Sequence, residues 1–242
     1  MHLVIDAGNT HVKLALFNKS GKRYGSIKLI DFDYKLLTNY IQSISKIEST
    51  IYCSVRSDDG RFIKFLQSNY PTHVLDIKSR LPFVNKYKTP NTLGKDRIAN
   101  IAAASQLAGN VLVVDAGTCI KFDLLEKNKS YCGGSIHPGI RMRYKALNHF
   151  TGKLPLIEFI PKKINTNKLI GTSTEACLNT GVELAIILEV EAIIARYKQK
   201  FPNLITIITG GDLRFFSQQI NFTFAARDFT LQGLYQILKL NS

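Results

Sequence analysis

The chain has 242 residues, of which 45% are hydrophobic and 21% are charged, and its formal net charge is +14. This length allows one large domain or two domains of about 100–150 residues. No run of about 18 apolar residues occurs, so we expect no membrane span. The basic residues suit an anionic ligand or nucleic acid, but they are dispersed along the chain, which is more typical of solvated surface lysines.

Neither the first residues of the chain nor its cysteines suggest a secreted or zinc-binding protein. The first residues lack a basic segment followed by a long apolar stretch, so we expect them to form the first strand rather than a signal peptide. The four cysteines (Cys53, Cys119, Cys132 and Cys177) lie far apart, without Cys-x-x-Cys spacing or paired histidines. A zinc site or a disulfide framework is therefore not expected, and a reduced cytoplasm fits.

The order of predicted elements indicates two α/β halves. In the first half we predict strands at 3–5, 12–17, 26–30, 50–55 and 74–77, and helices over 34–44, 61–69 and 97–107. Residues 78–93, with two prolines and four cations, read as a loop. In the second half we predict strands at 111–114, 120–125, 130–135, 205–208 and 222–225, and helices over 142–150, 174–200, 213–220 and 231–240, with a break near Gly181. The simplest division is a domain over 1–109 and a domain over 110–242.

An Asp-Ala-Gly turn after an apolar run occurs twice. The first copy is Asp6-Ala7-Gly8-Asn9-Thr10, where the glycine permits close backbone approach and the polar side chains can hold phosphate oxygens. Asp6 can hold Mg²⁺ directly or through a water molecule. An ordinary β-turn explains this copy equally well. The second copy, Asp115-Ala116-Gly117-Thr118, favours a phosphate site, because turns use many different sequences. The repeat indicates a duplicated fold with a nucleotide cleft between its halves.

Other polar clusters can be explained by a structural role or by a role in binding or catalysis. Asp96 and Arg97 enter a helix, either as dipole-compatible solvated residues or as a carboxylate base beside a substrate clamp. Thr209-Gly210-Gly211-Asp212 suits a tight strand–helix connection or an adenosine contact. Residues 133–139 (Gly-Gly-Ser-Ile-His-Pro-Gly) read as a loop over the cleft, with a structural or exposed role for His137. Residues 171–175 read as a helix start with capping hydroxyls.

As a set, these motifs resemble the type III pantothenate kinases of the acetate/sugar kinase–Hsp70–actin superfamily. The matching segments are 6–10, 94–100 (Gly-Lys-Asp-Arg-Ile-Ala-Asn), 115–118, 133–139, 171–174 and 209–211, and they span nearly the whole chain. The Asp-Arg-x-x-Asn element separates this family from the sugar kinases of the superfamily. Lys121 stands where many members have Thr or Ser, and Lys95 stands where a small residue or proline is common.

The resemblance implies roles for individual residues. It implies that Asp96 is the proton acceptor, that Asp115 holds a monovalent cation, K⁺ or NH₄⁺, and that Mg²⁺ accompanies ATP. The implied ATP-binding residues are Asp6, Ala7, Gly8, Asn9, Thr10, His11, Val12, Lys13 and Thr118. The implied pantothenate contacts are Tyr87, Gly94, Lys95, Asp96, Arg97 and Thr172.

The resemblance also implies two ribonuclease-H-like domains, with the active site between them, in a cytoplasmic homodimer. The implied activity is ATP-dependent phosphorylation of pantothenate to 4′-phosphopantothenate, the first step of coenzyme A biosynthesis. Two alternatives stay open from the residues. One is a sugar or small-acid kinase of the same superfamily, and the other is a basic nucleic-acid-binding regulator on this fold.

Overall fold

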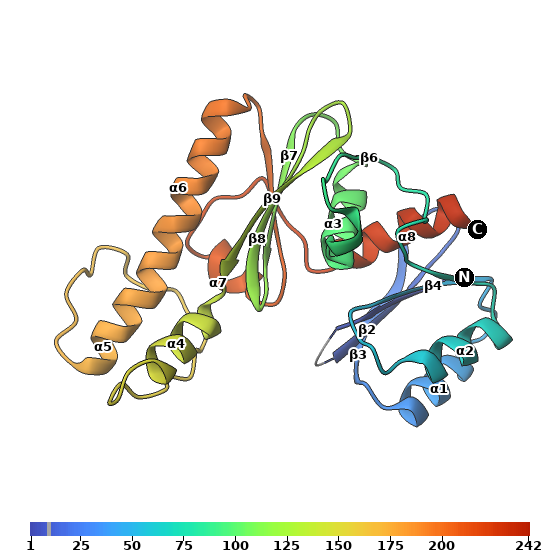
Figure 1. Ribbon diagram of the computed structural model, residues 1–242, viewed down its shortest axis with the longest axis horizontal. Helices are drawn as coiled ribbons and strands as arrows, with labels where there is room; N and C mark the ends of the chain where they lie inside the picture. The colour runs from blue at the N-terminus through green and yellow to red at the C-terminus, as the bar shows by residue number, and fades with distance from the viewer. Residues whose placement is uncertain (9–10) are drawn as a thin grey trace. The chain divides into compact units, whose positions relative to one another are not determined.

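The computed structural model describes residues 1–8 and 11–242, which form two compact units. The first unit comprises Met1–Leu107, Lys129–Cys132 and Asp228–Ser242, and the second comprises Ala108–Asn128 and Gly133–Arg227. Each unit contains a β-sheet with helices packed on it (Figure 1). Across the described residues, no helix is long and apolar enough to cross a membrane.

The sheet of the first unit has the strand order β3-β2-β1-β4-β5. Its strands are β1 (His2–Ala7), β2 (His11–Phe17), β3 (Arg23–Asp31), β4 (Ser49–Ser54) and β5 (Thr72–Val74). Strand β1 is antiparallel to β2 and parallel to β4, and β4 is parallel to β5. The central strand β1 is therefore paired on both edges, which fixes the position of the Asp6 backbone at its end.

Helices α1 (Tyr34–Gln42) and α2 (Gly60–Asn69) cover one face of this sheet (Figure 1). Helix α1 begins where the Asp33 carboxylate accepts a hydrogen bond from the Leu36 backbone N–H at 2.8 Å, which satisfies one unpaired donor of the first turn. Apolar residues at helical spacing, Leu37 and Ile41 in α1 and Phe62 and Leu66 in α2, pack with alternate residues of the strands. This packing places the core of the first unit between the sheet and these two helices.

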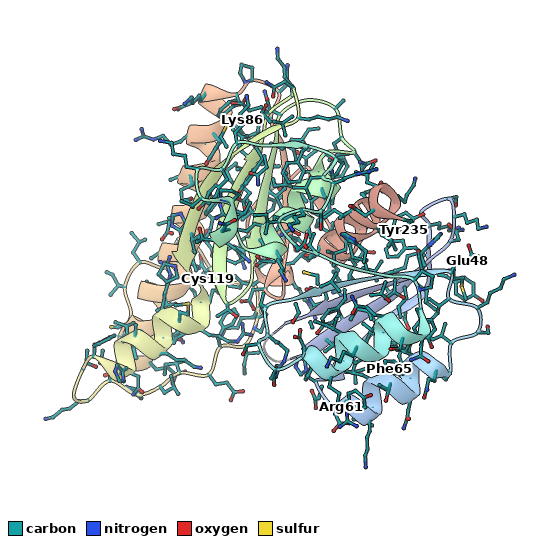
Figure 2. All side chains as sticks on the ribbon, turned by 45° about the vertical axis from the view of Figure 1, so that its right-hand side comes forward. Glu48, Arg61, Phe65, Lys86, Cys119 and Tyr235 are labelled. Atoms are coloured by element: carbon teal, nitrogen blue, oxygen red, sulfur yellow. The ribbon has the colours of Figure 1, made fainter. Side chains whose placement is uncertain are left out.

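Helices α3 (Lys95–Ala104) and α8 (Phe229–Asn241) lie on the other face of the first sheet. Tyr235 of α8, labelled in Figure 2, stacks on Phe17 of β2 with ring centroids 4.8 Å apart. The backbones of α3 and α8 are in very close approach, because a Cβ atom on Gly233 would lie 1.7 Å from the Ala99 carbonyl oxygen. Glycine at this position therefore allows the last helix of the chain to support α3.

The second unit repeats the strand order of the first. Its strands are β7 (Val111–Ala116), β8 (Cys119–Leu125), β10 (Ile205–Thr209), β11 (Phe224–Ala225) and the part of β9 (Ser130–Pro138) from Gly133 onward, in the order β11-β10-β7-β8-β9. Ser130–Cys132 of β9 belong to the first unit, where they pair with the sixth strand of this sheet, β6 (Val84–Asn85). Strand β7 is antiparallel to β8 and parallel to β10, and β10 is parallel to β11. These directions match those of β1, β2, β4 and β5, so Asp115 ends the central strand β7 just as Asp6 ends β1.

The helices of the second unit are α4 (Ile140–His149), α5 (Thr174–Asn179), α6 (Ala185–Lys200) and α7 (Leu213–Ser217). Their apolar residues share a core with the strands, including Tyr144, Ile187 and Phe215. The break expected near Gly181 is a π-helical segment, Thr180–Leu184, that joins α5 to α6 without ending the helix.

Three local predictions were wrong. The strand predicted at 74–77 is β5 at Thr72–Val74, and the predicted loop 78–93 contains strand β6 (Val84–Asn85) and a short 3-10 helix (Pro90–Thr92). The loop predicted over 133–139 is strand up to Pro138, because β9 runs beyond the strand predicted at 130–135. A Cβ atom on Gly134 would lie 1.7 Å from the Phe122 carbonyl oxygen, so glycine is required here for close backbone approach within a sheet rather than for a loop.

Candidate active site

The first Asp-Ala-Gly turn is closed by its own backbone. The Gly8 N–H donates to the His11 carbonyl oxygen at 3.1 Å, and Asp6 lies directly across the strand pair from Lys13. Ala7 and Val12 are fully buried, so any contact from these two residues to a ligand would come from their backbones. The His11 ring nitrogen Nδ1 lies 2.9 Å from the Asp31 carboxylate. The predicted phosphate contacts Asn9 and Thr10 lie outside the described residues.

Asp96 lies in the first turn of α3, beside the glycine that precedes this helix. Its Oδ1 atom accepts a hydrogen bond from the Arg97 backbone N–H at 2.9 Å. A Cβ atom on Gly94 would lie 2.5 Å from the same oxygen, so glycine leaves room for the carboxylate at the helix start. The negative charge of Asp96 is also favourable at this end of the helix dipole.

Asp6 and Asp96 are far apart in the sequence, but both carboxylates influence the pKa of one buried thiol, that of Cys53. Cys53 is the residue before the last in β4 and pairs with Asp6, and its side chain is almost completely buried. Burial is the main cause that raises the pKa of this thiol well above its ordinary value; Asp6 raises it further, the Lys95 ammonium lowers it, and Asp96 raises it. Strand β4 pairs with β1, which carries Asp6, and contacts helix α3, which carries Asp96, so both elements lie against the same strand of the first unit.

Arg97 and Tyr87, two predicted substrate contacts, lie together. The Arg97 guanidinium is 5.5 Å from the centre of the Tyr87 ring, and the Arg97 residue is only 4% exposed. Tyr87 stacks on Tyr131, with ring planes inclined by 16°. This stack depends on the short pairing of β6 with β9, in which the Lys86 N–H donates to the Tyr131 carbonyl oxygen at 2.8 Å. The sequence did not predict that β9 would support the substrate residues.

Asn100, the last residue of the 94–100 motif, is tied to the C-terminal helix. Its side-chain oxygen accepts a hydrogen bond from the Thr230 hydroxyl at 2.9 Å, and Asn100 is 1% exposed. The motif is therefore held in place by α8, which belongs to the first unit although it comes last in the chain. Helical periodicity predicted this helix but carried no information about its partner.

The second Asp-Ala-Gly turn carries an ion pair that the sequence did not predict. The Lys121 Nζ atom lies 2.7 Å from the Asp115 Oδ2 atom, and the two side chains are 14% and 12% exposed. The Gly117 N–H donates to the Cys119 carbonyl oxygen at 3.0 Å, which closes this turn as Gly8 closes the first. Thr118, the predicted ATP contact, is an exposed residue at the tip of the turn. Cys119, at the start of β8, is labelled in Figure 2.

The third glycine turn lies beside the second. Gly210 has a φ of +96°, and a Cβ atom there would lie 2.3 Å from the Ala116 carbonyl oxygen, so this position requires glycine. The Asp212 N–H donates to the same carbonyl oxygen at 2.9 Å. The Arg141 Nη1 atom lies 2.7 and 2.9 Å from the two carboxylate oxygens of Asp212. Arg141 therefore adds a cationic group near this turn, which the sequence analysis missed because no motif contains it.

The remaining predicted residues lie elsewhere in the second unit. His137 lies 2.8 Å from the Glu189 carboxylate and packs edge-on against Phe122, which is the structural kind of role expected for it. Ser173 caps α5, since its hydroxyl accepts a hydrogen bond from the Ala176 N–H at 3.2 Å. Thr172 precedes this cap and lines a hollow of about 780 Å³ together with Leu147, Leu154 and Cys177.

Comparisons with known proteins identify the family of this chain. The sequence profile of the type III pantothenate kinases matches residues 2–196. A type III pantothenate kinase from Christiangramia forsetii is 41% identical over 244 residues, covering 100% of this chain and 99% of that protein. A type III pantothenate kinase from Bacteroides fragilis (strain ATCC 25285) is 36% identical over 248 residues, covering 100% of this chain and 99% of that protein.

Two solved structures share the fold. A Campylobacter jejuni protein assigned to the Baf family of transcriptional activators has a TM-score of 0.63 at 22% identity, covering 99% of this chain and 98% of that one. A Sinorhizobium meliloti protein assigned as a 2-dehydro-3-deoxygalactonokinase has a TM-score of 0.62 at 13% identity, covering 99% of this chain and 98% of that one. At these identities the likeness concerns the mixed α/β fold alone. The profile match and the full-length relatives show that this chain belongs to the type III pantothenate kinase family.

Proposed function

We propose that the start of α3 is the acceptor site for the ATP-dependent phosphorylation of pantothenate that membership in this family assigns to the chain. The product is 4′-phosphopantothenate, and the reaction is the first step of coenzyme A biosynthesis. The observation that carries this proposal is geometric: Asp6 on β1 pairs with Cys53 on β4, and helix α3, whose first turn holds Asp96, packs against the same strand β4. A phosphate turn and a carboxylate base must be neighbours if a hydroxyl is to attack the γ-phosphate of ATP.

Asp96 is assigned as the proton acceptor for the primary hydroxyl of pantothenate. Phosphoryl transfer passes through a loose transition state, so the protein contributes mainly by positioning groups and balancing charge. The Asp96 carboxylate is positioned by a hydrogen bond from the Arg97 N–H in the first turn of α3. Arg97 binds either the substrate carboxylate or phosphate charge, and Tyr87 restricts its guanidinium. Gly94, Lys95 and Tyr87 complete the proposed contacts in the first unit, and Thr172 is a proposed contact from the second.

The nucleotide is assigned to the two Asp-Ala-Gly turns. Residues 6–13 would meet the phosphates, and Thr118 would contact ATP from the second turn. Among the described residues, no group of three or more His, Cys, Asp or Glu side chains could hold a metal ion. Mg²⁺ in kinases is commonly bound by substrate phosphates and only one or two carboxylates, so Asp6 as a single direct or water-mediated ligand fits that chemistry.

Five strands of the second sheet follow the same order as the five strands of the first, which supports a duplicated, ribonuclease-H-like architecture. The compact units differ from the predicted domains at 1–109 and 110–242, because Asp228–Ser242 belong to the first unit. That domain division, the nucleotide cleft, the homodimer and the cytoplasmic location stay predictions. A monovalent cation at Asp115 also stays a prediction, and Lys121 bears on it directly because its ammonium already contacts that carboxylate.

The first experiment measures ATP consumption with and without pantothenate, alongside a panel of sugars and small acids. Consumption that depends on pantothenate supports the proposal, whereas consumption that depends on a sugar would favour the alternative kinase. Salt-dependent binding to duplex DNA with no kinase activity would favour the nucleic-acid-binding alternative.

The second experiment replaces the proposed base. Asp96→Asn keeps an oxygen that can accept the hydrogen bond from Arg97, so we expect the fold and ATP binding to persist. Turnover should fall by about 10²–10⁴-fold, the usual contribution of a positioned general base. Asp58→Asn is the matched control, because the Asp58 side chain is 61% exposed and forms a local ion pair with Arg56, two residues away. Turnover of Asp96→Asn equal to that of the control would remove Asp96 as the base.

A further inference from the structure

The Asp115 carboxylate is already neutralised by a residue of the chain. Lys121 Nζ lies 2.7 Å from Asp115 Oδ2, and both side chains are largely buried. The other carboxylate oxygen, Oδ1, faces the backbone of Gly210 so closely that a Cβ atom there would lie 2.6 Å away. An added K⁺ bound to this carboxylate would be next to the lysine ammonium, where two like charges repel strongly in a poorly hydrated site.

This ion pair is fixed by the strand pairing rather than by a mobile loop. Asp115 on β7 and Lys121 on β8 are direct cross-strand partners. Strand β7 is also paired to β10, where Thr209 lies beside Asp115. The lysine ammonium is therefore held at a constant position, at the end of the central strand and next to the Gly117–Thr118 turn.

We propose that the Lys121 ammonium supplies the positive charge that the family resemblance assigns to a monovalent cation at Asp115. Lys121 is then a charge-compensating residue for the anionic nucleotide at the second turn, and this chain binds and uses ATP without K⁺ or NH₄⁺. A lysine ammonium and an ammonium ion are the same kind of donor, with one charge and several N–H groups. The inference rests on the proposed assignment of ATP to the Thr118 turn.

A purely structural ion pair would predict different behaviour. If Lys121 only stabilised the β7–β8 hairpin, its loss would lower the stability of the protein, and small cations would not specifically restore nucleotide binding. If Lys121 supplies charge to the nucleotide site, removing it leaves a carboxylate and a vacated volume that a small cation can occupy. Rescue by added cations therefore separates the two roles.

The test measures binding of the Mg²⁺ complex of a non-hydrolysable ATP analogue by calorimetry, with choline, K⁺ or NH₄⁺ as the monovalent cation. For the wild type we expect dissociation constants within about twofold of one another in the three salts. For Lys121→Thr we expect binding at least about tenfold weaker in choline, with recovery in K⁺ or NH₄⁺, because a charge-assisted contact has been removed. Lys121→Arg keeps the charge and should stay independent of the added cation.

Lys127→Thr is the matched control, since Lys127 is an exposed residue just beyond β8 whose backbone N–H, which the substitution keeps, donates to the Asn110 side-chain oxygen at 2.9 Å. It should behave as the wild type in all three salts. A wild type whose nucleotide binding requires K⁺ would overturn the inference, and so would a folded Lys121→Thr whose binding is weak in every salt. Thermal unfolding in each salt identifies any variant that has lost its fold.

Turnover measurements keep this inference distinct from the proposed function. Pantothenate-dependent ATP consumption that is equal in choline and K⁺ agrees with both. Consumption that is seen only with K⁺ or NH₄⁺ supports the proposed function and overturns the inference. Cation-independent nucleotide binding without any pantothenate-dependent consumption would count against the proposed acceptor and leave the assignment of Lys121 standing.

Discussion

Substitution of Gly233 by alanine tests the packing that holds the proposed substrate helix in place. Gly233 lies in α8, where an added Cβ atom would be 1.7 Å from the Ala99 carbonyl oxygen, 2.6 Å from its carbon and 3.0 Å from the Ala103 nitrogen. All three atoms belong to the backbone of α3, so no flexible side chain can move aside. Ordinary contact begins at 3.4 Å, and the two helices would have to separate by more than an ångström.

Two opposing effects decide whether Gly233→Ala raises or lowers the free energy of unfolding. Alanine is favoured over glycine inside a helix by about 1 kcal/mol. Overpacking of a close-packed interface costs about 1–3 kcal/mol, and a clash between backbone atoms places Gly233→Ala at or above the upper end of that range. We therefore expect a net destabilisation of about 2 kcal/mol. For a chain of this size that corresponds to a melting temperature lower by about 4–8 °C.

Thermal unfolding monitored by circular dichroism measures this effect. Gly60→Ala is the control, because Gly60 is the first residue of α2 in the same unit and a Cβ atom there meets nothing within 4 Å. That variant should be neutral or slightly more stable than the wild type. Gly233→Ala should also lower kcat/KM for pantothenate more than for ATP, since α3 carries Asp96 and Arg97. A Gly233→Ala protein at least as stable as the control would refute the packing argument.

Two further predictions concern the aromatic contact and a buried carboxyl group. Tyr87→Leu should raise the KM for pantothenate by about 2–30-fold, the range of a cation–π contact of about 0.5–2 kcal/mol, with little change in the KM for ATP. Tyr87→Phe keeps the ring and should stay near the wild type; equal KM values for Phe and Leu would contradict this role of the ring. Burial is the main cause that raises the pKa of Glu183 above its ordinary value of 4.5, against the opposing effects of the Tyr144 hydroxyl and Lys162. The folded state therefore holds this proton in a range above pH 4.5 where the unfolded state has lost it, so Glu183 lowers stability as pH rises through that range. Glu183→Gln should flatten this part of the pH dependence of urea unfolding and raise the urea concentration at the unfolding midpoint at pH 8. An unchanged pH profile would argue against this role of Glu183.

The strands were predictable because buried strands appear in the sequence as short runs of apolar residues that end at turn residues. Apolar runs such as Val111–Val114 identified β7, and the Asp-Ala-Gly turns identified where the central strands end. The predicted helix over 61–69 is α2, Gly60–Asn69, since its apolar residues recur at helical spacing and face one core. The candidate site residues were identifiable as a set because the motifs carry them, although their contacts were not.

Features that depend on distant partners could not be predicted. Strand β6 consists of Val84 and Asn85, too short to show a period, and it forms only because Ser130 and Tyr131 pair with it. Gly133 and Gly134 were predicted both in a strand over 130–135 and in a loop over 133–139, and the close approach of Gly134 to Phe122 that extends the strand to Pro138 depends on a distant partner. The contact between Lys121 and Asp115 required the register of β7 and β8, which the sequence alone did not define.

The two Asp-Ala-Gly hairpins share a cross-strand design but differ in their loops. Asp6 is opposite Lys13, and Asp115 is opposite Lys121. The last paired residues are Ala7 with Val12 in the first hairpin and Ala116 with Ile120 in the second, so the second loop is one residue shorter. Thr118 therefore stands alone between Gly117 and Cys119, whereas the first loop offers two polar side chains after its glycine. The longer loop suits several phosphate contacts, and the shorter one, with its lysine on the carboxylate, suits one hydroxyl contact beside a fixed positive charge.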